Sequence, residues 1–441
     1  MRALLANRDA RWYLAGQTLS VVGDNALWLA MGIWVKILTG SSSAAGLVFF
    51  AFTAGILLAP VTGLVADRVR RRPLLVAANL AAAALVCVLL AARGPGQVWL
   101  IYPVMFGYGA LNSLITSAQT AFLTVMLPSE LLGEANSVLQ MAQMGLRVIS
   151  PLLGAGLLAW AGPVPVVLLD AGTFAVAAGT VAVLRVREPA PAPAATHWRT
   201  ELTAGIRYIG RTPVLRRLLI TGVIALLVFG FFETVPFAVV GQGLHRVATF
   251  LGVLEAVMGV GALAGGAFAA PAMRWAGERT VVALGLLGCA VSCLLLIPPW
   301  LPAVLAGMGL LGVSIVWINV GALTLIQRRT PTDLLGRVDA ALNVALTVPQ
   351  TASIALGAAL IAVVDYRILL VVMAVVVVLS AAYLAAEPAS GAEPASGTDP
   401  AAPMTGVTSP VVASPAVASP LAVGPAPRPE TGGHGSGVIR E

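Results

Sequence analysis

Residues 74–92 read LLVAANLAAAALVCVLLAA, an apolar run without a charged side chain. Two further runs of similar length and character lie at 281–298 and 368–386. A hydrocarbon core about 30 Å thick needs roughly 20 helical residues to cross it, and a helix satisfies its own backbone hydrogen bonds there. Each run therefore predicts a membrane-spanning helix.

The composition of the whole chain agrees with this prediction. Of the 441 residues, 59% are apolar and 10% are charged, whereas a soluble domain carries about 25% charged residues. A large soluble helical core is disfavoured by the same runs, because soluble helices keep a polar face. The sequence therefore predicts an all-α polytopic membrane protein.

Breaks at glycine, proline and charge clusters divide the apolar sequence into separate spans. They predict twelve transmembrane helices, and an even number returns the C-terminus to the side on which the chain starts. The predicted ranges are 12–38, 44–66, 73–92, 97–125, 136–160, 163–185, 214–241, 248–272, 279–298, 301–327, 337–362 and 367–386.

These spans fall into two groups of six, which gives the chain four predicted parts. A bundle over 1–185 and a bundle over 214–386 are joined by a basic linker over 186–213. Residues 387–441 are rich in Pro, Ala, Ser and Gly and show no helical or strand period. We interpret this last part as a disordered cytoplasmic tail.

The linker contains a short amphipathic pattern. Its apolar residues Trp198, Leu202, Ile206 and Ile209 fall at helical spacing, with arginines between them. This pattern predicts a helix that lies at the membrane surface.

Positive charge is concentrated on one side of the predicted membrane. The net charge is +7, and the predicted outer loops contain only Lys36, Arg93, Arg246 and Arg367. Arginines elsewhere cluster between spans on the opposite side, which predicts that both termini are cytoplasmic. Because these arginines lie at span ends, we expect no binding to nucleic acid.

We expect no ATP, cofactor or metal site. Lys36 is the only lysine and Ile37 follows it, so a G-x-x-x-x-G-K-[ST] phosphate loop is excluded. Cys289 and Cys293 lie one helical turn apart inside an apolar run and are interpreted as small buried hydrophobes. The sequence shows no paired catalytic constellation, and we do not expect an enzyme.

An internal repeat connects the two halves. Residues 128–137, PSELLGEANS, match residues 331–340, PTDLLGRVDA, and each segment lies between the fourth and fifth spans of its half. Two parallel six-helix repeats are the scaffold of many alternating-access carriers, which hold their substrate between the repeats near the midplane.

The loop over 63–72, GLVADRVRRR, follows the second span. It resembles the signature loop of the major facilitator superfamily, G-x-x-x-D-R-x-G-R-[RK], with Arg70 in place of a glycine. The second half keeps only traces of the motif, Gly266 and Arg274 to Arg279. The resemblance implies a major facilitator fold of two six-helix pseudo-repeats, over residues 1–386.

The loop also places one acid among several arginines. We predict that Asp67 caps a helix end near guanidinium groups, so that charge pairs hold the cytoplasmic side closed. In the alternative, the arginines only fix the topology. The residues assigned to this cytoplasmic gate motif are Gly63, Asp67, Arg68, Arg71 and Arg72.

Within the superfamily, the sequence is similar to the bacterial drug and siderophore exporters. The matching pieces are residues 23–24, 131–137 and 327–337. Gly145 and the segment 150–156, SPLLGAG, partly match the antiporter signature that ends G-P-x-x-G-G. The resemblance implies a location in the bacterial cell membrane and efflux coupled to proton entry.

Charged residues inside spans are unfavourable unless paired or hydrated, so each is a candidate functional residue. Asp24, Glu233 and Glu255 are the predicted proton-coupling candidates, because burial favours the neutral form of a carboxylate and so allows proton exchange. The resemblance implies that Asp24 and Glu233 face water, since the first, fourth, seventh and tenth helices line the cavity. It places Asp170 on a peripheral helix, where we expect a structural role.

Polar and aromatic side chains in the spans are candidates for lining the substrate cavity. A mostly apolar cavity with two or three carboxylates suits amphipathic cations or neutral drug-like molecules. Helix packing is the alternative role for each residue. The candidates are Asn25, Trp28, Asn112, Gln119, Arg147, Trp317, Asn319, Asn343 and Gln350.

Three functions remain open at this point. The first is a proton-coupled exporter of a drug-like molecule or secondary metabolite, with the small-molecule substrate, protons and the lipid bilayer as its partners. The second is a nutrient importer or facilitator with structural carboxylates. The third is a lipid-handling or sensor protein that transports nothing. We expect a monomer in each case.

Overall fold

The computed structural model describes residues 7–184, 186, 188, 198–331 and 334–386, which are nearly all helical and contain no strand. The predicted tail over 387–441 and the start of the predicted linker, 189–197, lie outside the described residues. The prediction of an all-α fold is confirmed for the described part of the chain.

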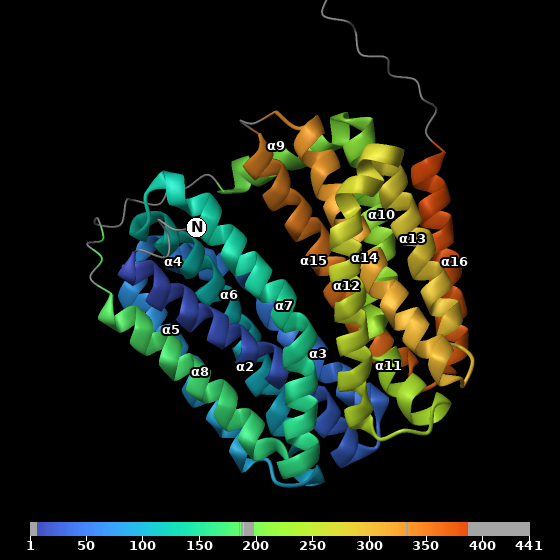
Figure 1. Cartoon of the computed structure of the whole chain (residues 1–441), viewed down its shortest axis with the longest axis horizontal. Helices are drawn as coiled ribbons and strands as arrows, with labels where there is room; N and C mark the ends of the chain where they lie inside the picture. Colours follow the sequence, from blue (N-terminus) through green and yellow to red (C-terminus); the bar gives the residue numbers. More distant parts are fainter. Residues whose placement is uncertain (1–6, 185, 187, 189–197, 332–333, 387–441) are drawn as a thin grey trace, which may run out of the picture. The chain divides into compact units, whose positions relative to one another are not determined.

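The first half forms the N-terminal bundle, α2 to α8 (Figure 1). A 3₁₀ segment, Val88–Ala91, extends α5, and another, Pro95–Leu100, leads into α6. The helices are α2 (Arg8–Thr39), α3 (Ser42–Ile56), α4 (Ala59–Arg68), α5 (Arg71–Cys87), α6 (Ile101–Met126), α7 (Ser129–Ala161) and α8 (Pro163–Val183).

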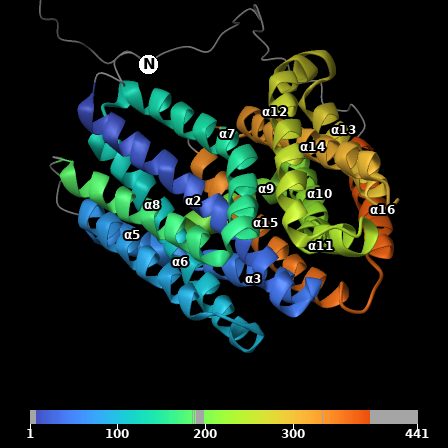
Figure 2. The same ribbon diagram turned by 60° about the horizontal axis from the view of Figure 1, so that its bottom comes forward.

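The second half forms the C-terminal bundle, α10 to α16, and α9 (Trp198–Arg211) precedes it. The turned view in Figure 2 shows α3 beside α11 and α15, and α7 beside α12, so the two bundles are in contact. The helices of this bundle are α10 (Pro213–Phe229), α11 (Val235–Ala238), α12 (Leu251–Ala276), α13 (Glu278–Leu295), α14 (Leu301–Arg329), α15 (Leu335–Leu360) and α16 (Tyr366–Ala385).

The spans largely follow the predicted ranges. Among the described residues, ten helices are long and apolar enough to cross a membrane, and α3 with α4 make an eleventh if the bent pair is one span. The remaining predicted span corresponds to α15, whose apolar part, Val344–Leu360, is shorter. The repeat segments found in the sequence fall at the starts of α7 and α15, in matching places.

The two bundles repeat the same close helix contact. In the N-terminal bundle, a Cβ atom on Gly55 or Gly109 would collide with the backbone of the facing helix, so α3 and α6 touch directly. In the C-terminal bundle, Gly261 and Gly312 bring α12 and α14 together in the same way. Small residues permit this approach between membrane helices. The second and fourth spans of each half therefore pack alike.

Two spans depart from the regular helix that the sequence suggested. The second bends by 42° between α3 and α4, where Pro60 opens α4 and cannot donate a backbone hydrogen bond. The seventh passes from α10 through a 3₁₀ turn, Gly230–Glu233, into α11 and a π-helical segment, Val239–Gly243. Such irregular segments inside a helix often mark functional positions.

The predicted linker helix is present as α9. Its Ile209 is buried in a small apolar cluster with Leu215, Val338 and Leu342. The Tyr208 hydroxyl donates to a backbone carbonyl oxygen at the end of α14, at 3.0 Å. The helix is therefore attached to the C-terminal bundle. Its position at a membrane surface stays a prediction.

Candidate functional site

A cavity of about 530 Å³ lies between the bundles. Helices α10, α12, α13, α14 and α15 form most of its wall, and the N-terminal bundle contributes Trp28 from α2 and Arg147 from α7. Aromatic rings of Phe229 and Phe232 add apolar surface. The cavity extends along α14 to Ile326, within one turn of the helix end.

Three charged side chains face this central cavity. Glu233 comes from the 3₁₀ turn after α10, and Glu255 lies in the second turn of α12. The two carboxylates are close enough to repel each other, and Arg147 attracts Glu255. Each charge at membrane depth costs about 3 kcal/mol on insertion scales unless it is paired or hydrated. The mostly apolar cavity thus carries one uncompensated negative charge when both acids are ionised.

Not all the predicted cavity residues line this cavity. Asn25 donates to the backbone oxygen of Val21 at 2.9 Å, and the Trp317 indole donates to the backbone oxygen of Gly265 at 3.0 Å. These two side chains instead form hydrogen bonds with backbone carbonyl oxygens of the helices. The predicted residues that line the cavity are Trp28, Arg147, Glu233, Glu255, Asn319 and Gln350. The predicted residues outside its lining are Asp24, Asn25, Asn112, Gln119 and Trp317, and the Asn343 side chain lies outside the described residues.

Asp24 belongs to a second group of polar side chains, within the N-terminal bundle. Its Oδ1 accepts a hydrogen bond from the Tyr108 hydroxyl of α6, at 2.6 Å. Asp170, on α8, interacts with both residues and is fully buried. The family resemblance placed Asp170 on a peripheral helix, and its proximity to Asp24 was not predicted. Gln119 lies in the same bundle, where its amide donates to Gln17 of α2.

The gate motif surrounds the break between α4 and α5. Gly63, Asp67 and Arg68 lie on α4, and Asp67 and Arg68 are exposed. Arg70 has φ −58°, so the turn needs no glycine. Among the described residues Asp67 makes no hydrogen bond or ion pair, and the prediction that it caps a helix end was wrong.

The cap of α5 comes from a residue that the sequence analysis missed. The Glu188 carboxylate, just beyond α8, accepts hydrogen bonds from the backbone amides of Arg71 and Arg72 at 2.7 and 2.6 Å. The Arg72 guanidinium donates in return to the last carbonyls of α8, Val181 at 3.2 Å and Ala182. An acid directly after an Arg-x-Arg sequence at a span end was the available signal.

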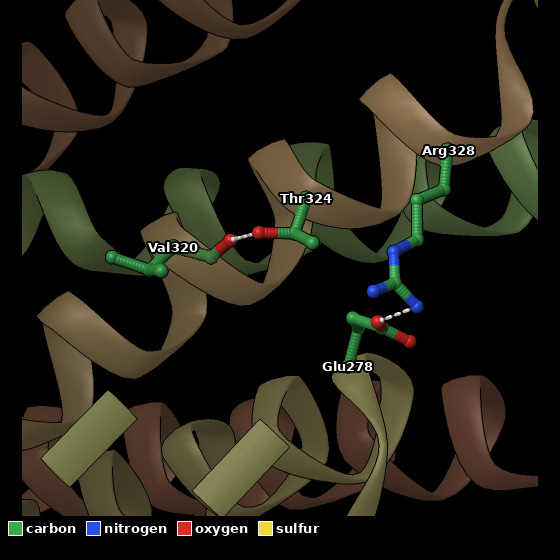
Figure 3. A network of polar contacts seen from close by, with 4 residues as sticks. All are labelled: Glu278, Val320, Thr324 and Arg328. Carbon is green, nitrogen blue, oxygen red and sulfur yellow. Dashed lines mark hydrogen bonds and ion pairs between the residues drawn. The ribbon is translucent and has the colours of Figure 1, made fainter. Parts of the chain in front are cut away.

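The C-terminal bundle has a counterpart of this arginine contact. The Arg279 guanidinium, in the first turn of α13, donates to the Leu384 carbonyl at the end of α16, at 2.9 Å for its Nε. The Glu278 carboxylate forms an ion pair with the Arg328 guanidinium of α14, with an N–O distance of 2.6 Å (Figure 3). Third and sixth spans are therefore tied together by an arginine in both halves.

Two membrane bundles around a cavity that contains charged side chains form the scaffold typical of alternating-access carriers. The chain belongs to the Major Facilitator Superfamily, whose family model matches residues 13–350. It is a multi-pass membrane transporter and not an enzyme.

Similar proteins agree with this assignment. The uncharacterized MFS-type transporter YfiS of Bacillus subtilis is 24% identical, over 79% of this chain and 85% of its own. The enterobactin exporter EntS of Citrobacter koseri is 26% identical, over 78% and 82%. A bacterial homologue of the iron transporter ferroportin superposes with a TM-score of 0.68 in its inward-facing state, at 16% identity over 86% of this chain and 98% of that one. Its outward-facing structure scores 0.58, at 18% identity over 86% and 99%.

Proposed function

We propose that this transporter exports a drug-like or secondary-metabolite molecule from the cytoplasm of a bacterial cell in exchange for protons. The observation that carries the proposal is the central cavity, which combines two adjacent carboxylates and one guanidinium with aromatic and aliphatic walls. The similarity to an enterobactin exporter supports the outward direction.

The contacts between the bundles support an inward-facing state. They gather at the end away from Arg72 and Arg279: Gly46 packs on Thr234 and Ala358, and the rings of Phe49 and Phe237 lie 6.0 Å apart. Gly252 of α12 also packs against α7. The cavity extends towards the opposite, arginine-rich end. By the positive-inside rule that end is cytoplasmic, and the fold is more similar to the inward-facing ferroportin homologue than to the outward-facing one.

In this mechanism the cavity acids carry the coupling proton. With Glu233 and Glu255 both ionised, the cavity attracts a cationic or amphipathic substrate from the cytoplasm, while the aromatic rings receive its apolar part. After the switch to the outer side, a proton neutralises an acid and the substrate leaves. Arg147 lies on the opposite bundle from Glu255, so the strength of their attraction depends on how the bundles are placed.

Transport in proteoliposomes tests the proposal. The purified full chain is reconstituted, a pH gradient is imposed, and movement of the aromatic cation ethidium is recorded together with the internal pH. Exchange predicts that ethidium moves against the proton flow and that an ionophore abolishes its accumulation. A panel of chemically different probes extends the test to other substrates.

The two alternatives give different results in the same experiment. A facilitator equilibrates its probe without a proton flux, and a proton-coupled importer moves probe and protons in the same direction. A lipid-handling protein or sensor moves no small probe in any member of the panel. Co-directional movement, or uncoupled movement at an unchanged rate, would refute proton-coupled export.

A further inference from the structure

Asp170 is a buried acid that the central cavity does not explain. It lies in the middle of α8, its side chain is 0% exposed, and neither carboxylate oxygen meets the geometry of a hydrogen bond with any described residue. An ionised carboxylate without water or an opposite charge is strongly unfavourable, and such groups become neutral or bind a cation. Asp170 therefore needs a proton or a metal ion.

The titratable groups that face Asp170 come from two neighbouring helices. They are Asp24 of α2, which repels it, and Tyr108 of α6, whose hydroxyl lies close to both carboxylates. Tyr108 uses its single hydrogen to bond Asp24 at 2.6 Å. Its oxygen still has acceptor capacity, and Tyr108 also interacts with Asp170.

The surroundings hold this arrangement in place. The Tyr108 ring packs between Phe52 and Phe174, with centroids 5.5 and 5.8 Å away. A Cβ atom on Gly23 would lie 2.6 Å from Asp170 Oδ1, so the backbone of α2 lies directly against the acid. Asp24 is only partly buried and is the exposed end of the group.

We propose that Asp24, Tyr108 and Asp170 form a proton-holding site inside the N-terminal bundle, separate from the central cavity. One proton is shared by two carboxylates: Asp170 carries it and donates to the Tyr108 oxygen, and the Tyr108 hydroxyl donates to ionised Asp24. The site holds its proton whether or not the cavity acids exchange theirs.

A concerted shift moves this proton without any other reactant. Tyr108 gives its hydrogen to Asp24 and takes the hydrogen of Asp170, so the O–H bond of Asp170 breaks and one forms on Asp24. The negative charge passes from Asp24 to Asp170 and Tyr108 ends unchanged.

A proton fits this site better than a metal ion. Hard cations such as Ca²⁺ take six to eight oxygen ligands, whereas the site offers two carboxylates and one hydroxyl. The described residues contain no group of three or more His, Cys, Asp or Glu side chains that could hold a metal. The close backbone of Gly23 also leaves little room beside Asp170.

Infrared difference spectroscopy on the purified full chain in lipid nanodiscs tests the site. At neutral pH, the protein should show a protonated-carboxyl C=O band that shifts in D₂O. We expect Asp170→Asn to remove one such band and the matched control, Glu233→Gln with Glu255→Gln, to keep it. An Asp170→Asn spectrum that retains every protonated-carboxyl band would overturn the proposal.

A second variant covers the case in which Asp170→Asn does not fold. Tyr108→Phe removes the bridging oxygen, so the band should persist but move to the position of a carboxyl group without a hydrogen bond. A band that does not move contradicts the bridge. Spectra in sodium and in choline buffer at one pH examine the cation alternative, and loss of the band in sodium alone would show a sodium site instead.

Discussion

The two bundles share a scaffold but place their acids differently. Both use paired glycines to bring their second and fourth spans together, and both use an arginine to tie the third span to the sixth. The acids do not repeat: Asp24 and Asp170 lie inside the N-terminal bundle, whereas Glu233 and Glu255 face the cavity between the bundles. The two bundles thus share their helix packing but differ in where their acidic side chains lie.

The largest expected effect comes from the cavity acids. We expect Glu233→Gln with Glu255→Gln to lower proton-driven transport by at least about tenfold, equal to about 1.4 kcal/mol in the transport barrier. The reason is that neither amide can take up and release the coupling proton. The measurement is the initial rate of probe movement in proteoliposomes under an imposed pH gradient.

A variant outside the cavity lining tests whether this effect belongs to the cavity. Glu278→Gln also removes one carboxylate from the C-terminal bundle, but at the start of α13 rather than in the cavity lining. It should keep coupled transport. Equal losses in both variants would mean that the cavity has no special role among the acids of this bundle.

Substitutions at the repeated glycine contacts should have the next largest effect, which is on stability. We expect Gly109→Ala in the first bundle and Gly312→Ala in the second to destabilise the protein by about 1–3 kcal/mol each, because the added methyl group collides with a facing backbone. Thermal unfolding in detergent provides the measurement. Gly172→Ala is the matched control, since nothing lies within 4 Å of a Cβ atom there. A loss confined to one bundle would show that the packing is not equivalent.

Much of this scaffold could be predicted from the sequence, because span length and composition depend on the bilayer alone. The irregular segments within the spans could not be predicted. The 3₁₀ turn that carries Glu233 begins at Gly230, which packs against Ser353 and Ile354 of α15. That contact joins residues more than a hundred positions apart and leaves no local pattern in the sequence.

The site was predictable in its residue types but not in its grouping. Asp24 and Trp28 lie one turn apart on α2, so the sequence assigned both to one cavity. Trp28 lines that cavity, whereas Asp24 bonds Tyr108 of another helix. Glu188 was missed for the same reason, because its partners at Arg71 and Arg72 come from a different span.

The arginine contacts between third and sixth spans should have a smaller effect than the glycines. Hydrogen bonds from a charged donor contribute about 1.5–3 kcal/mol in favourable cases, and partial exposure at the bundle end reduces this to about 1 kcal/mol for Arg72→Gln and Arg279→Gln. Lysine at either position keeps the charge but not the planar donor group, and should restore only part of the stability. Thermal unfolding of the four variants compares the two bundles directly. If only Arg72→Gln destabilises the protein, the two bundles do not depend equally on this arginine contact.

The ion pair between Arg328 and Glu278 should matter least for stability. Its N–O distance is short, 2.6 Å, but the Arg328 side chain is 70% exposed, so water and salt screen the attraction. We expect Arg328→Gln to change the free energy of unfolding by less than about 0.5 kcal/mol. The pair still joins α14 to α13 beside the arginine contact of Arg279, where the described residues show no matching ion pair in the N-terminal bundle. The measurement is the free energy of unfolding at low and at high salt. A salt-dependent loss of stability well above about 0.5 kcal/mol would mean that the C-terminal bundle relies on this ion pair, whereas the N-terminal bundle relies on the Glu188 cap.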